Sequence, residues 1–92
     1  MSPPPITDVR FVATGERDRA AGLFGYVSVT LADCFVLDGI TLRRTADRRW
    51  TLSFPARTDP RGGRHPYLRP ANDATRRAFE QRVFEALGLG ER

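Results

Sequence analysis

The sequence has few of the residues that cross-linking, metal binding and catalysis require. Of its 92 residues, one is cysteine (Cys34), one is histidine (His65) and none is lysine. A single cysteine excludes an internal disulfide and a zinc site built from several cysteines. No apolar run approaches the roughly 20 residues that a membrane-spanning helix needs, and residues 1–5 lack the basic start and apolar centre of a secretory signal. We therefore expect a cytoplasmic protein that does not enter a membrane.

The few candidate catalytic groups form no recognisable constellation. Cys34 stands in a predicted turn beside Phe35, which favours an inert thiol, and His65 lies in a predicted loop. Asp33 and Asp38 flank the start of a predicted strand, which favours turn and edge roles. The sequence contains no Gly-rich phosphate loop, zinc-ligand spacing or acidic calcium loop. We therefore expect no enzyme activity, no catalytic residue, no cofactor, no metal and no small-molecule substrate.

Length and composition indicate one folded domain, covering residues 1–92. Hydrophobic residues make up 40% of the chain and charged residues 28%, which is typical of a globular protein. A chain this short buries only about 60–65% of the surface that its unfolded form exposes. Association with a second copy would add to its stability.

Period-two patterns predict strands over residues 6–54. Apolar and polar side chains alternate in four segments, which are residues 6–13, 23–31, 35–42 and 50–54. Gly39 is a predicted bulge, and residues 14–22 are a predicted loop or wide hairpin turn. Because short turns join these strands, the sequence predicts an antiparallel sheet of about four strands.

The second half of the chain predicts a loop and then a helix. Residues 55–72 contain four prolines and a Gly-Gly pair, which indicates a long ordered loop. Asn72 or Asp73 is placed to cap a helix over residues 73–88, which Gly88 would end. Its predicted apolar face consists of Phe79, Val83, Ala86 and Leu87.

These elements predict an α+β fold, with a small antiparallel sheet and a C-terminal amphipathic helix. Residues 1–5, with three prolines, form a predicted extended tail before the sheet. One helix can cover only one face of a sheet, and an uncovered edge invites pairing with another chain. We therefore expect a homodimer through strand pairing.

Positive charge is concentrated in the second half of the chain. Residues 43–82 contain 11 arginines and four acidic residues, a net charge of +7, whereas residues 1–42 carry −2. A GC-rich genome would explain the absence of lysine but not this segregation. The pattern indicates an anionic partner, of which nucleic acid is the commonest.

The predicted nucleic-acid-binding residues lie in the basic loop and the first helical turns. Helix N-termini attract phosphate, and guanidinium groups bind it in a bidentate manner. Arg76 and Arg77 oppose the helix dipole, which an anionic ligand would explain. The alternative is that Asp73 and Glu80 pair with these arginines, with Arg76–Glu80 as an i,i+4 pair in the weaker orientation. Tyr67 is placed to stack on a base. The predicted set is Arg57, Arg61, Arg64, Arg69, Arg76, Arg77 and Tyr67, with a basic turn at Arg43, Arg44, Arg48 and Arg49 as a further candidate.

Several motifs occur in an order that resembles a known family. They are TDVR (7–10), SVTL (28–31), FVLDGI (35–40), FPAR (54–57), PRG (60–62) and PANDATR (70–76). Together they resemble the stage V sporulation protein G (SpoVG), or septation regulator, family over residues 6–85. This sequence differs in having Arg69-Pro70 where the family usually has His-Pro, and in a longer first hairpin loop.

The resemblance implies a dimeric antiparallel sheet with a C-terminal helix, and a regulator that binds DNA or RNA and affects septation. It also implies that Arg57 and Arg76 contact nucleic acid. We therefore expect a nucleic-acid-binding regulatory protein. The alternative is a non-enzymatic module that binds an acidic protein partner in cell division, since charge alone does not separate the two.

Overall fold

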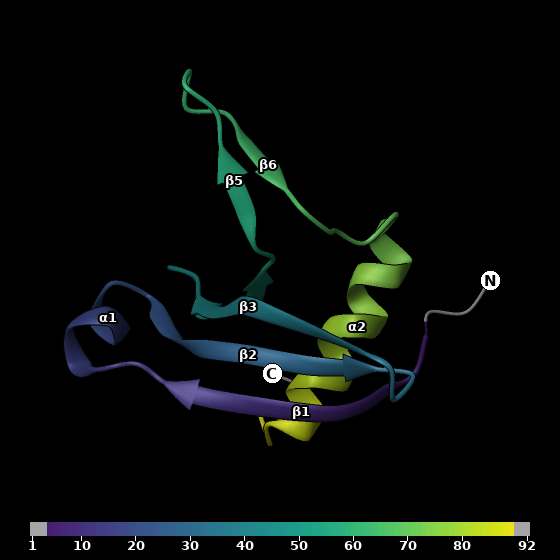
Figure 1. Ribbon diagram of the computed structural model, residues 1–92. Helices are drawn as coiled ribbons and strands as arrows, with labels where there is room; N and C mark the ends of the chain where they lie inside the picture. The colour runs from purple at the N-terminus through teal and green to yellow at the C-terminus, as the bar shows by residue number, and fades with distance from the viewer. Residues whose placement is uncertain (1–3, 90–92) are drawn as a thin grey trace.

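The computed structural model describes residues 4–89 and has an α+β fold (Figure 1). Its elements are β1 (Ile6–Ala13), α1 (Glu16–Ala20), β2 (Leu23–Leu31), β3 (Phe35–Arg44), β4 (Trp50–Ser53), β5 (Ala56–Thr58), β6 (Arg64–Pro66) and α2 (Asp73–Ala86). Strands β1 to β4 form one antiparallel sheet in sequential order, and β5 pairs with β6 in a separate hairpin. The predicted fold class and the four main strands are confirmed. Most of the predicted tail lies outside the described residues.

The core lies between α2 and one face of the four-stranded sheet. Alternate residues of β2, β3 and β4 point toward the helix, as the period-two pattern predicts. The buried residues are Val27, Val29, Ile40, Leu42, Leu52, Phe54 and Val83. On the other face Tyr26 remains 47% exposed and Val12 67% exposed. In Figure 1, α2 lies on one side of the sheet only.

The predicted irregularity at Gly39 is present in β3. The register between β2 and β3 shifts between Val27 and Val29, opposite the segment that contains Gly39. Gly39 has a φ of 78°, a left-handed conformation that favours glycine. The shift lets Leu37 and Ile40 both pair with core-facing residues of β2.

Helix α2 begins and ends where the sequence predicts. The Asn72 side chain accepts a hydrogen bond of 2.8 Å from the Thr75 N–H, and Gly88 follows the helix with a φ of 75°. Val83 is fully buried, and Phe79, Phe84 and Leu87 pack around the core. The prediction that Ala86 belongs to the apolar face is wrong, because this residue is exposed near the end of the helix.

Two predicted loops contain regular structure. Residues 14–22 include α1, a five-residue helix with no buried residue. Residues 55–72 include the β5–β6 hairpin, so their interpretation as a loop without elements is wrong. Both elements are too short for a periodic pattern to reveal them. Within residues 4–89 no helix has both the length and the apolarity needed to cross a membrane.

Candidate nucleic-acid interface

The β5–β6 hairpin projects from the end of the sheet (Figure 1) and is closed by a turn built around Asp59. Asp59 Oδ1 accepts hydrogen bonds from the N–H groups of Arg61, at 2.9 Å, and Gly63, at 2.8 Å. Gly62 has a φ of 87°, and a Cβ at Gly63 would lie 2.8 Å from Asp59 Oδ2. The turn therefore requires the Gly-Gly pair, and it fixes the hairpin that carries the basic side chains.

The histidine of the sequence also belongs to this turn. His65 Nε2 lies 2.7 Å from Asp59 Oδ2 and donates a hydrogen bond to it. This bond, together with those from the Gly63 and Arg61 N–H groups, holds the pKa of Asp59 below its ordinary value of 3.8. His65 is half-exposed and bound to a carboxylate, whereas Cys34 lies in the β2–β3 turn, where its thiol donates to the Ala32 carbonyl.

The predicted arginines of residues 55–72 point in different directions. Arg57 pairs across the hairpin with His65, and Thr58 pairs with Arg64, so Arg57 and Arg64 lie on opposite faces of this two-stranded ribbon. Arg61 lies in the exposed turn. None of these three guanidinium groups has a carboxylate within 4.0 Å among residues 4–89. The hairpin thus presents unneutralised positive charge on both faces and at its tip.

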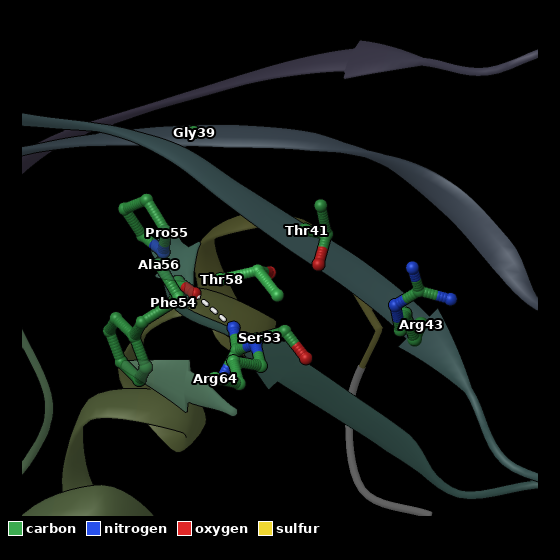
Figure 2. A pocket seen from close by; sticks show the side chains of 9 residues that line it. All are labelled: Gly39, Thr41, Arg43, Ser53, Phe54, Pro55, Ala56, Thr58 and Arg64. Atoms are coloured by element: carbon green, nitrogen blue, oxygen red, sulfur yellow. Dashed lines mark hydrogen bonds between the residues drawn. The ribbon is translucent and has the colours of Figure 1, made fainter. Parts of the chain in front are cut away.

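A cavity of about 290 Å³ lies between the base of the hairpin and the uncovered face of the sheet (Figure 2). Arg43 of β3 and Arg64 of β6 contribute guanidinium groups to it, and no acidic residue lines it. The Arg64 guanidinium donates a hydrogen bond to the Phe54 carbonyl, which leaves other N–H groups of its five available. The remaining polar groups are the hydroxyls of Thr41, Ser53 and Thr58.

The uncovered face continues from this cavity toward an exposed aromatic side chain. Tyr26 pairs with Thr41, which pairs with Ser53, so these three residues form one row across β2, β3 and β4. Arg43 lies two residues beyond Thr41 and therefore on the same face. An exposed tyrosine beside arginines and hydroxyls combines base stacking with phosphate binding. The sequence predicted no role for Tyr26, because the pattern alone does not tell which face the helix covers.

The two remaining predicted residues before α2 are exposed. Tyr67 is 71% exposed, and its backbone N–H donates to the Pro55 carbonyl at 2.9 Å. Arg69 lines a separate apolar cavity of about 210 Å³ beside the start of α2. Both side chains are accessible, but they lie in the connection to the helix rather than on the hairpin strands.

Arg76 and Arg77 have different surroundings. Arg76 Nη1 lies 3.4 Å from Glu80 Oε2, and its guanidinium carbon lies 5.9 Å from the centre of the Phe54 ring. Glu80 also accepts from the Leu52 N–H at 3.4 Å. The alternative interpretation of Arg76, an ion pair within the helix, is therefore confirmed. Arg77 is exposed and has no carboxylate partner among the described residues.

The structure does not bring all the predicted residues to one surface. Arg57, Arg61 and Arg64 share the hairpin, and Arg64 and Arg43 line the same cavity beside the sheet. Asp59 was missed as a turn-forming residue, although a DPRGG sequence between short polar segments is a hairpin signal. No protein-family model matches this chain, and no curated protein matches it either.

Proposed function

We propose that the chain binds nucleic acid, DNA or RNA, through the β5–β6 hairpin and the uncovered face of the sheet. The observation that carries this proposal is the grouping of Arg43, Arg57, Arg61 and Arg64, none of which has a carboxylate partner among residues 4–89. Each guanidinium group can bind a phosphate, and release of counterions from the polynucleotide would drive association.

The aromatic side chains add a preference for unpaired bases. Tyr26 is exposed on the uncovered face of the sheet, in β2, and Tyr67 is exposed directly after the hairpin. A single strand exposes the faces of its bases to such side chains, whereas a duplex keeps them stacked. We therefore favour single-stranded RNA or DNA as the ligand, with the phosphates along the hairpin and bases over Tyr26.

The proposal includes the biological setting that the sequence motifs imply. A homodimer joined through strand pairing, a cytoplasmic location and a regulatory role of the SpoVG type, in septation or gene expression, are its further parts. Two chains would place two hairpins and two sheet faces in one assembly, which increases the number of phosphates bound.

Fluorescence anisotropy with labelled single strands and duplexes of equal length tests the proposal. The triple variant Arg57→Gln, Arg61→Gln and Arg64→Gln removes three charges and should weaken binding at least tenfold. Arg17→Gln in α1 is the matched control, since it removes an exposed arginine away from the hairpin. Equal affinity of the triple variant and the control would contradict the proposal.

Tyr26→Ala and strand length distinguish nucleic acid from an acidic protein partner. Loss of Tyr26 should weaken single-strand binding by about 1–3 kcal/mol, the usual contribution of one stacked base. Affinity should also rise with strand length until the surface is filled. An affinity that depends neither on Tyr26 nor on strand length would instead favour a contact based on charge alone.

A further inference from the structure

A second basic cavity lies at the other end of the sheet, where α1 meets the β3–β4 turn. It has a volume of about 510 Å³. The Arg44 N–H donates to the Gly22 carbonyl at 2.8 Å, which attaches the α1–β2 corner to the end of β3. The Thr14 hydroxyl donates to the Leu23 carbonyl at 2.7 Å and fixes the start of the same corner. These bonds hold α1 and the start of β2 against the end of β3, next to the cavity.

Three arginines from different segments line this cavity. Arg19 comes from α1, Arg44 from the end of β3 and Arg48 from the following turn, where it has a φ of 67°. Apolar surface from Ala20, Ala21 and Phe24 forms part of the wall, and no acidic residue lines it. The cavity thus combines three positive groups with an apolar wall.

Neighbouring groups orient two of these arginines without neutralising them. Arg19 Nη1 donates to the Thr14 carbonyl at 3.1 Å, and the Arg44 guanidinium lies 4.4 Å from the centre of the Trp50 ring. Among residues 4–89, none of the three lining arginines has a carboxylate within 4.0 Å.

The acidic residue of the adjoining turn, Asp47, binds other partners than the three arginines of the cavity. Asp47 lies 3.3 Å from the Arg49 guanidinium and accepts a hydrogen bond from the Thr45 hydroxyl. That hydroxyl bond is the main reason why the pKa of Asp47 lies below its ordinary value of 3.8. Three positive charges therefore share one cavity, and their mutual repulsion favours an anion between them.

We propose that this cavity binds a phosphate monoester, with the phosphate among Arg19, Arg44 and Arg48 and its organic part against Phe24. A monoester carries close to two negative charges at neutral pH, which suits three guanidinium groups better than the single charge of a diester. The volume exceeds what a bare phosphate fills and accommodates an attached sugar or base.

This site is separate from the proposed nucleic-acid interface. Arg44 lies two residues after the core residue Leu42, and its strand partner Trp50 lies two residues before the core residue Leu52. Both therefore lie on the helix-covered side of the sheet. The inference therefore does not depend on the hairpin arginines. A phosphate monoester of this kind is found both in a free nucleoside monophosphate and at the phosphorylated end of a nucleic-acid strand.

Titration of the full chain monitored by Trp50 fluorescence tests the proposal, because Trp50 is the only tryptophan and contacts Arg44. The probes are AMP, adenosine, and thymidine oligomers with a 5′-phosphate or a 5′-hydroxyl. A saturable response to AMP but not to adenosine would assign a free nucleotide. A response to the 5′-phosphorylated oligomer alone would assign a strand end.

The double variant Arg19→Gln and Arg48→Gln should weaken the assigned response at least tenfold. Arg17→Gln on the same helix is the control and should leave it unchanged, since Arg17 does not line the cavity. Circular dichroism verifies that both variants fold. The proposal is overturned if neither phosphorylated probe gives a saturable response, if adenosine or the 5′-hydroxyl oligomer responds equally, or if the control loses as much as the double variant.

Discussion

At the residue scale, the arginines of this chain differ in what surrounds their charge. Arg76 is half-buried against Phe54 and paired with Glu80. Arg57 and Arg61 are exposed on the hairpin and have no carboxylate partner in the part of the chain that the structure describes. A guanidinium group that already binds a carboxylate has less to gain from a phosphate. Arg76 therefore stabilises the fold, and the hairpin arginines are the candidates for ligand contacts.

Paired substitutions test this division of roles. Arg76→Gln should lower the free energy of unfolding by up to about 1 kcal/mol, since it removes a partly exposed ion pair, and should leave nucleic-acid affinity nearly unchanged. Arg57→Gln should leave stability unchanged and reduce the salt slope of binding by about 1. Urea unfolding and binding isotherms measure the two effects. The reverse pattern would contradict the assignment.

Asp59 makes the order of the hairpin depend on pH. Its pKa is lowered in the folded chain by hydrogen bonds from His65 and from the Gly63 and Arg61 N–H groups, so the folded state favours the ionised carboxylate. The resulting stabilisation is present above the ordinary pKa of 3.8 and is lost as the pH falls through the lower folded value.

Amide NMR signals of the turn should report this titration. The Arg61 and Gly63 signals should shift together as Asp59 is protonated. Asp59→Asn should remove this pH dependence and preserve the turn, because the side-chain oxygen of asparagine can still accept the two backbone hydrogen bonds. Signals of β2 serve as the internal reference. Turn signals that shift independently of each other, or a pH dependence that Asp59→Asn leaves unchanged, would contradict the role of this carboxylate.

At the element scale, the sequence predicts what packs on the core and misses what does not. Strands β2 to β4 and α2 were predictable because their alternating or helical patterns match a buried face, and β1 because its length and its residues Ile6 and Val9 at the core give it a pattern. The three-residue strands of the hairpin and the five-residue helix α1 bury no residue fully, so no pattern marks them. The hairpin depends instead on turn chemistry at Asp59, Gly62 and Gly63.

The candidate site was predictable only in part for the same reason. Charge counting identified the basic segment and the residues Arg57, Arg61 and Arg64. It did not show that Arg64 and Arg43 line one cavity, because this depends on how the hairpin is placed relative to the sheet. The pairing of Arg76 was one of two interpretations that helical spacing allows, and packing against Leu52 and Phe54 decides between them.

Substitution of the N-cap residue Asn72 tests how helix α2 is stabilised. Asn72→Ala removes the acceptor for the Thr75 N–H and should lower the free energy of unfolding by about 1 kcal/mol. Asn72→Ser preserves an acceptor and should recover most of the loss. Thermal and urea unfolding measure both variants. Equal stability of the alanine and serine variants would contradict the cap.

The exposed edge of β1 bears on the proposed dimer. β1 has eight residues and a neighbour on one side only, so its outer N–H and C=O groups can pair with a second chain. Light scattering after size exclusion should give about twice the 10.3 kDa of one chain, and β1 amides should be protected from hydrogen exchange. A mass of one chain across the concentration range would contradict pairing through this edge.

At the scale of the whole molecule, the fold distributes the +7 charge of residues 43–82 over two faces. Part of this charge surrounds the hairpin and the uncovered face of the sheet, and another part, Arg44 and Arg48, joins Arg19 of α1 in the cavity on the other face. The first suits a long polyanion that follows a surface, whereas the second suits one compact anion. The net charge alone does not separate these arrangements, because it carries no information on which side of the sheet each arginine lies.

Salt dependence of nucleic-acid affinity tests the central claim most directly. If two chains together bind about four to eight phosphates, the logarithm of the association constant for single-stranded nucleic acid should fall with the logarithm of the salt concentration at a slope of about −3 to −6. The triple hairpin variant should bring this slope markedly closer to zero. A slope near zero for the unmodified chain, or a slope that the triple variant leaves unchanged, would contradict binding through the hairpin.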